Sequence, residues 1–257
     1  MSHTKMNILR EGATNGTPLV LVHGYTGDNQ SWRLISPMLD AKRPVIMPDL
    51  PSHGISPLWV PDSFDAFVEE IASNLEEQVP APFHLVGHSL GGAVAFALSK
   101  RMRAAIKSLT AVAPAGLGPE VDDNFIAHYP SATEPDEIRR WMQHIVGKGF
   151  ELPEAMPHLV AEKRQDPERI KAQVEIGRIL LPDGVQSVSV AREMEAVDVP
   201  CKIIWGKQDT LIPWEHALSA PASVGLHLMP EVGHMPNVEA PGLLARLIEE
   251  NITAAGG

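Results

Sequence analysis

Residues 83–92 read FHLVGHSLGG, and the small and apolar residues of 93–98 (AVAFAL) follow them directly. An apolar run ends at Gly87 and a helical pattern begins just past Ser89, which places a Gly-x-Ser-x-Gly motif between a predicted strand and a predicted helix. The turn is so tight that the residues two before and two after the serine must be small. Its hydroxyl would project out of the sheet, beside helix N–H groups that face developing negative charge.

Length and composition favour one large soluble α/β domain. The chain has 257 residues and a net charge of −11 with no lysine or arginine cluster, so we expect neither nucleic acid nor membrane as a partner. Cys201 is the single cysteine, which excludes an internal disulfide. Residues 1–7 lack the apolar core of a signal peptide, and no apolar run is long enough to span a bilayer. We therefore expect a cytoplasmic protein.

Apolar strand patterns alternate with amphipathic helix patterns, which predicts a mostly parallel sheet covered by helices on both faces. The aliphatic run 19–22 is typical of a strand that is buried on both sides. The predicted strands are 5–11, 19–22, 44–48, 83–87, 106–113, 201–206 and 224–229. The predicted helices are 32–39 with Ser31 as its cap, 64–79, the segment after Ser89, and 241–251.

The alternation stops over residues 117–195, where amphipathic stretches are broken by prolines. So long a loop is implausible in a compact domain, so we expect a helical lid inserted between two parts of the core, 1–116 and 196–257. Its apolar residues either line an adaptable substrate pocket or pack the core of the lid itself. The residues in question are Ile126, Met142, Ile145, Met156 and Leu159.

A serine nucleophile needs a base, and the base needs an orienting acid. His234 follows one predicted strand and Asp209 follows the strand before it, so both are expected at the carboxyl edge of the sheet, where open α/β folds place their sites. The order Ser89, Asp209, His234 is the nucleophile–acid–base order of α/β hydrolases. We expect these three residues to be catalytic.

The oxyanion of such a reaction needs two N–H donors. The backbone N–H groups of Leu90, just after the nucleophile, and Tyr25, after the first buried strand, are the candidates. Neighbouring polar residues are expected to hold loops rather than to react, namely His23, His53, His88 and Asp49.

Metal and nucleotide chemistry are not indicated by the sequence. His128, His144 and His158 are too widely spaced to argue for zinc. No Gly-x-Gly-x-x-Gly follows the first strand, so we expect no nucleotide cofactor and no metal.

Several motifs in register resemble the α/β-hydrolase superfamily over nearly the whole chain. These are residues 23–24 (HG), 49–54 (DLPSHG), 87–92 (GHSLGG), 205–209 (WGKQD) and 233–236 (GHMP). The resemblance implies the α/β-hydrolase fold and a Ser-His-Asp mechanism.

Two further stretches, 23–28 (HGYTGD) and 112–120 (VAPAGLGPE), resemble a narrower group. That group is the hydrolase-like domain of proteins named as the acyltransferase component of acetoin dehydrogenase. Those proteins also carry a lipoyl domain, whereas no Asp-Lys-Ala lipoylation site occurs here. We therefore expect a free-standing hydrolase.

Other branches of the superfamily fit less well. Carbon–carbon bond hydrolases usually have small residues and a proline where this chain has residues 25–27 (YTG). Haloalkane dehalogenases and epoxide hydrolases have an aspartate nucleophile in place of Ser89, and epoxide hydrolases also use lid tyrosines, of which only Tyr129 is present.

We expect a monomeric or homodimeric esterase-like serine hydrolase that cleaves a small or medium carboxylic ester or a related acyl compound. The alternatives are an acyltransferase or thioesterase, a carbon–carbon bond hydrolase, and a binding protein that keeps the fold without turnover.

Overall fold

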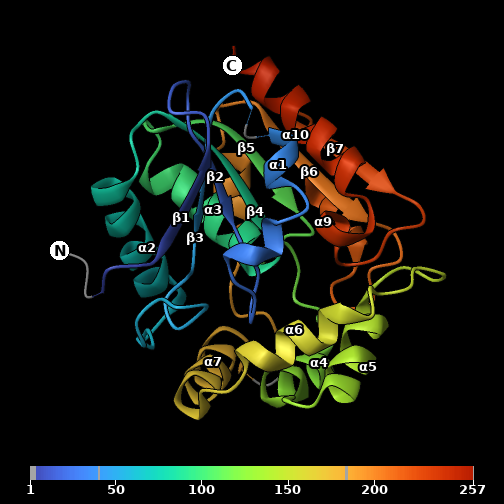
Figure 1. Ribbon diagram of the computed structural model, residues 1–257. Coiled ribbons are helices and arrows are strands. Elements are labelled where there is room, and N and C mark those ends of the chain that lie inside the picture. Colours follow the sequence, from blue (N-terminus) through green and yellow to red (C-terminus); the bar gives the residue numbers. More distant parts are fainter. Residues whose placement is uncertain (1–3, 40, 183–184, 257) are drawn as a thin grey trace.

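A computed structural model describes residues 4–39, 41–182 and 185–256, and its centre is a seven-stranded sheet (Figure 1). The strand order is β1-β3-β2-β4-β5-β6-β7, with β1 antiparallel to β3 and every other pair parallel. The strands are β1 (Ile8–Gly12), β2 (Leu19–Val22), β3 (Pro44–Pro48), β4 (Phe83–His88), β5 (Ile106–Val112), β6 (Cys201–Gly206) and β7 (Val224–Met229). The predicted mostly parallel sheet is therefore confirmed.

Helices cover both faces of this sheet, as the sequence predicted. One face carries α2 (Phe64–Gln78), α3 (Leu90–Arg101) and α8 (Ala191–Glu195), and the other carries α1 (Ser36–Leu39) and α10 (Pro241–Ala254). The short α9 (Pro236–Glu239) leads into α10. Side chains within β2 alternate between the two layers: Val20 and Val22 join the core under α3, while Leu19 and Leu21 join the core under α10.

The segment after β2 differs from the helix predicted over residues 32–39. A 3-10 helix, η1 (Asn29–Trp32), begins there, and α1 is only one turn long. The N-cap residue of η1 is Asp28, whose side chain accepts from Gln30 N, while Ser31 occupies the N3 position of a capping box. The prediction of Ser31 as the N-cap residue was wrong because Asp28, three residues earlier, takes that position.

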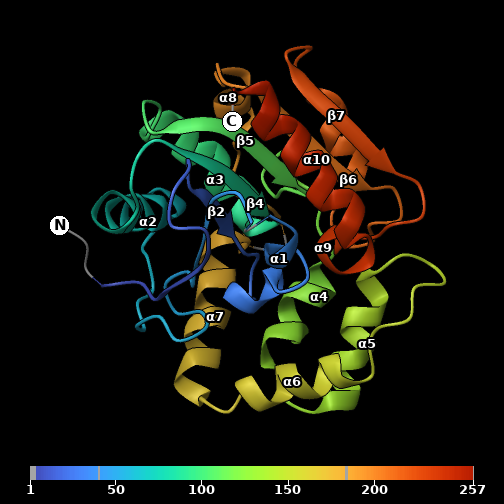
Figure 2. The same ribbon diagram turned by 45° about the horizontal axis from the view of Figure 1, so that its top comes forward.

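Four further helices lie together beyond one edge of the sheet, below it in Figures 1 and 2. They are α4 (Asp123–His128), α5 (Pro135–Ile145), α6 (Ala155–Lys163) and α7 (Pro167–Leu180), with η2 (Tyr129–Ser131) between the first two. We call α4 to α7 the cap. The strand-to-loop exits of β2, β4, β6 and β7 face it, so the cap lies over the edge where the candidate residues are found. In residues 4–39, 41–182 and 185–256, no helix has the length and apolar character needed to cross a membrane.

Candidate active site

The serine of the opening motif lies on a strained turn between β4 and α3. Ser89 has φ 55° and ψ −119°, in a region that residues with a Cβ rarely adopt. The strain is tolerated because Ser89 N donates to Val112 O (2.9 Å) and Ser89 O accepts from Gly92 N (2.8 Å). The turn thus presents the side chain at the start of α3.

Neighbouring glycines allow three backbone segments to pass close together at this turn. A methyl group on Gly87 would lie 2.0 Å from Gly91 O, and one on Gly91 would lie 2.4 Å from Val22 O. The N-terminus of α3 therefore packs directly on the backbone of β2 and β4, which is why small residues are needed on both sides of the serine.

Replacing Gly91 with Ala is expected to lower the free energy of unfolding by about 3 kcal/mol or more, because the added methyl overlaps carbonyl oxygens that cannot move independently of the sheet. Urea unfolding measures this loss. Gly242→Ala is the matched control, since Gly242 lies in α10 and the added methyl would have no atom within 4 Å beyond the adjoining residues and the backbone of its own helix. That change should be neutral or slightly stabilising. Equal stability of the two variants would contradict the expected packing.

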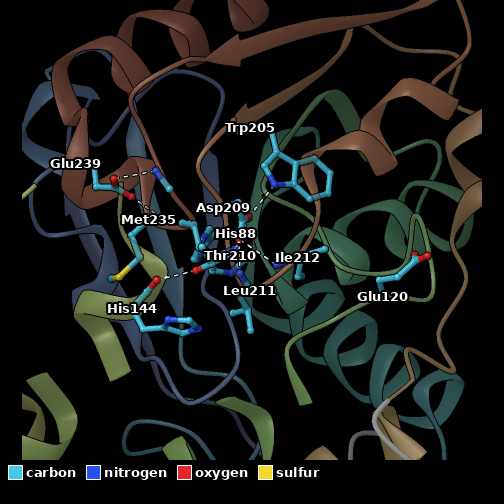
Figure 3. Close-up of polar contacts among 12 residues, drawn as sticks. His88, Glu120, His144, Trp205, Asp209, Thr210, Leu211, Ile212, Met235 and Glu239 are labelled. Atoms are coloured by element: carbon cyan, nitrogen blue, oxygen red, sulfur yellow. Dashed lines mark hydrogen bonds and ion pairs between the residues drawn. The ribbon is translucent and has the colours of Figure 1, made fainter. Parts of the chain in front are cut away.

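Asp209 and His234 meet at the same sheet edge, after β6 and β7. His234 Nδ1 lies 2.7 Å from Asp209 Oδ2, and both side chains are almost fully buried. Asp209 also accepts from Trp205 Nε1 (2.8 Å) and from the N–H groups of Leu211 (2.9 Å) and Ile212 (3.0 Å), as Figure 3 shows. All four hydrogen-bond partners that the structure gives this carboxylate are N–H or ring nitrogen groups. The bond to Asp209 Oδ2 therefore favours the His234 tautomer that carries its proton on Nδ1 and leaves Nε2 free to accept a hydrogen bond.

Contacts from the cap fix both loops, and sequence reasoning missed them. His234 N donates to Ile145 O (2.7 Å) at the end of α5. Thr210 Oγ1 donates to His144 O (2.6 Å), as Figure 3 shows. Glu239 also accepts from Gly233 N (2.8 Å) and from Gly147 N (2.7 Å). The end of α5 is therefore part of the support of the Asp209 and His234 loops. No periodicity in the sequence reports a contact between main chains so far apart.

The two backbone amides expected to bind an oxyanion belong to Leu90, which follows Ser89 in the chain, and to Tyr25, whose neighbour Gly24 approaches the Ser89 side chain. Leu90 is the first residue of α3, and Tyr25 follows β2 in a turn closed by a bond from Gly27 N to Gly24 O (3.1 Å). In the described part of the chain neither N–H group donates to a protein acceptor. The turn places Thr26 at φ 59°, in the left-handed region that a β-branched residue rarely adopts. The Tyr25 side chain reaches α7, where its hydroxyl donates to Gln173 O (2.7 Å).

A cavity of about 530 Å³ lies between the sheet edge and the cap. Ser89, His234 and Tyr25 all line it, so the structure brings these predicted residues to one pocket. The apolar cap residues named from the sequence line it as well, namely Ile126, Met142, Ile145, Met156 and Leu159. Three of these five, Met142, Ile145 and Met156, are also buried in the apolar cluster that extends from the core beneath α3. They therefore line the pocket and pack on the main core, rather than forming a core that belongs to the lid alone.

The other histidines of this edge hold loops, as expected. His23 Nε2 accepts from Leu50 N (3.0 Å) and its Nδ1 lies 2.8 Å from Gly24 O. His88 Nε2 lies 2.8 Å from His234 O, and His53 Nδ1 lies 2.8 Å from Pro51 O. Burial lowers the pKa of His53 and that of His88 from 6.5 to about 3, so both remain neutral at physiological pH.

Acidification from pH 7 to pH 5 is expected to cost about 2 kcal/mol of folding free energy for each of His53 and His88. In the unfolded chain both histidines bind protons as the pH falls below their ordinary pKa of 6.5. In the folded state both rings stay neutral until the pH approaches their lowered pKa of about 3, so stability falls as the pH decreases from 7 to 5. Urea unfolding at a series of pH values measures the slope. In His53→Gln the loss between pH 7 and pH 5 should shrink by about 2 kcal/mol; an unchanged slope would contradict the assignment.

Cys201 and Asp49 are the other reactive side chains that the sequence analysis considered, and both have structural surroundings. Cys201 is buried in β6, and burial raises the pKa of its thiol to about 12. Asp49 accepts from Asn29 N (2.7 Å) and Ile55 N (3.0 Å) and so joins two loops. Among the residues the structure describes, no group of three or more histidine, cysteine or acidic side chains could hold a metal ion.

Comparison with known proteins agrees with this architecture. The sequence model of the alpha/beta hydrolase family matches residues 19–247. The dihydrolipoyllysine-residue acetyltransferase component of the acetoin cleaving system from Pseudomonas putida is 32% identical over 89% of this chain, which spans 61% of that relative's length. The monoacylglycerol lipase ABHD6 from Homo sapiens is 25% identical over 90% of this chain and 73% of its own. The predicted resemblance to the acetoin-system proteins is confirmed.

Solved structures share the fold. A meta-cleavage product hydrolase from Pseudomonas fluorescens superposes with a TM-score of 0.85 at 21% identity, covering 98% of this chain and 95% of its own. An esterase from Thermogutta terrifontis gives a TM-score of 0.76 at 20% identity, covering 99% and 95%. At such identities the likeness establishes the predicted fold.

Proposed function

Because the chain belongs to the alpha/beta hydrolase family, we propose that it is a serine hydrolase that cleaves small or medium carboxylic esters or related acyl compounds. The observation that carries this proposal is the bond of 2.7 Å between His234 Nδ1 and the buried Asp209 Oδ2, beside a pocket that both His234 and Ser89 line. A hydrogen-bonded acid and base beside a serine on a strained elbow are the parts that acyl transfer through serine requires.

The proposed reaction proceeds through an acyl-enzyme. Ser89 Oγ attacks the ester carbonyl while His234 Nε2 takes its proton, and the amides of Tyr25 and Leu90 bind the oxyanion. His234 then protonates the leaving alcohol, and water, deprotonated by the same ring, releases the acid. Within the described residues Ser89 Oγ has no hydrogen-bond partner, so its bond to His234 would form when substrate orders the site.

In the proposed division of the chain, the core is formed by 1–116 and 196–257, and residues 117–195 form the lid. The cap helices support this, because they supply apolar walls of the pocket and anchor the Asp209 and His234 loops. The α8 helix lies within the lid range but packs on α3 of the core.

The direct test is intact-protein mass after treatment with a fluorophosphonate, followed by a series of p-nitrophenyl esters of increasing acyl length. One adduct on the wild type, absent from Ser89→Ala, would support an activated serine. No adduct on folded protein would overturn the proposal and favour a binding protein that keeps the fold.

Transfer to a thiol or amine instead of water is the second candidate, since the Pseudomonas putida relative is named an acetyltransferase. Both reactions share the acyl-enzyme. Adding a thiol or amine acceptor during ester turnover separates them: a new acylated product at the expense of free acid would identify transfer.

A further inference from the structure

Arg164 follows α6 directly and lines the pocket, yet it is 92% buried (8% exposed). Its Nη1 donates to Tyr129 O (2.6 Å) and to Ala132 O (3.0 Å). The guanidinium carbon lies over the Tyr129 ring, 4.2 Å from its centroid, so the positive charge is in contact with an aromatic face. The side chain is therefore held in one place by the cap.

One edge of this guanidinium has no protein partner. Nη2 is buried without any acceptor, and Nε donates to no acceptor in the described ranges. No carboxylate of these ranges lies within 4.0 Å of Arg164. A buried charge without a counter-ion destabilises the fold by about several kcal/mol. The Nε and Nη2 atoms form one edge of the guanidinium, and such an edge can donate two parallel hydrogen bonds to a carboxylate.

The other charges of the pocket are compensated or exposed. Lys163 forms an ion pair with Asp28, Arg169 lies 3.7 Å from Asp166, and Asp49 accepts from N–H groups. Arg33 is exposed to solvent. In a protein of net charge −11, Arg164 is therefore the pocket cation that is both buried and without a carboxylate partner among the described residues.

We propose that the Nε and Nη2 edge of Arg164 binds a carboxylate carried by the substrate, at a point remote from the ester that Ser89 attacks. This rests on the proposed function, and it makes the substrate a half-ester or another acyl compound with a free acid group. A carboxylate fits better than a phosphate because a single guanidinium edge offers two donors and one positive charge, while a phosphate dianion needs more of both. The charge of Arg164 also reaches Tyr25, where it opposes the rise in the pKa of the phenol that burial causes.

Matched substrates test the proposal on the intact protein. We would compare p-nitrophenyl half-esters of dicarboxylic acids of increasing chain length with the same compounds whose far carboxylate is methylated. The wild type should favour the free acid in kcat/KM, and Arg164→Gln should reduce that preference by about 10- to 100-fold while changing the rate on the neutral ester far less. Arg169→Gln is the matched control, because Arg169 already has Asp166 as its partner; it should keep the preference.

A binding measurement separates this site from the hydrolase proposal. Calorimetric titration of the wild type with the unesterified dicarboxylates needs no turnover, and Arg164→Gln should abolish the binding. Arg164→Lys keeps the charge without the planar edge and should bind more weakly than the wild type, which covers the case in which the glutamine variant fails to fold. Binding that depends on Arg164 without any esterase activity would sustain the site and reject the hydrolase. Esterase activity with equal rates on acid and neutral substrates would reject the site.

Discussion

Replacing Ser89 with Ala is expected to lower kcat on a p-nitrophenyl ester by a factor of about 10³ or more. The change removes the oxygen that would form the acyl-enzyme, and neither His234 nor Asp209 can replace it because both are engaged with each other. Steady-state kinetics measure the loss. Residual turnover should reflect only the pocket and the two free amides of Tyr25 and Leu90.

The variant should remain folded, since Ser89 Oγ makes no hydrogen bond within the described residues and alanine keeps the Cβ that already occupies the strained turn. Its melting temperature is therefore the control. Turnover within tenfold of the wild type, from a preparation free of contaminating esterase, would show that Ser89 is not the nucleophile.

Sequence patterns predicted the sheet because its strands are short, apolar and separated by turns. Residues 19–22 are buried throughout as β2, and β4 runs directly into the elbow. Once the strands are parallel, the ends of β4, β6 and β7 must share one edge. The bond between Asp209 and His234 follows from that geometry, even though 25 residues separate them.

Local patterns failed where long-range contacts decide. Residues 29–39 form two short helical turns rather than one helix, since Asn29 N is held by Asp49 and Trp32 is fully buried against the sheet. Two features depend on where the cap helices lie: the hydrogen bond from His234 N to Ile145 O, and the Arg164 guanidinium edge that has no protein partner. No periodicity of the cap sequence encodes that position. The hydrogen bond from Trp205 to Asp209 is different, because it is a local contact. Trp205 precedes Asp209 by four residues at the end of a strand, and the sequence alone shows that spacing.

Asp209→Asn is expected to reduce kcat by about 10³- to 10⁴-fold without removing any atom from the packing. In the wild type, the two carboxylate oxygens of Asp209 accept four hydrogen bonds. His234 Nδ1 and Trp205 Nε1 bond to Oδ2, and two backbone amides bond to Oδ1. An asparagine amide must turn its NH₂ toward one of these donor pairs. If it faces His234, the ring has to reverse its tautomer and carry its proton on Nε2, where it can no longer accept from Ser89. If it faces the main chain, the loop loses two hydrogen bonds.

Asp49→Asn separates the catalytic effect from the structural one, because it makes the same chemical change at another buried carboxylate that is surrounded by donors. Asp49 accepts from Asn29 N, Ile55 N and the Asn7 side chain, and it has no hydrogen bond to His234. Both variants should lose about 1 to 3 kcal/mol of stability in urea unfolding, since each leaves buried donors unpaired. The large fall in kcat should appear in Asp209→Asn alone. If the two variants lose turnover equally, Asp209 acts on the shape of the loop and not on His234, and the proposed acid of the triad would have to be sought elsewhere.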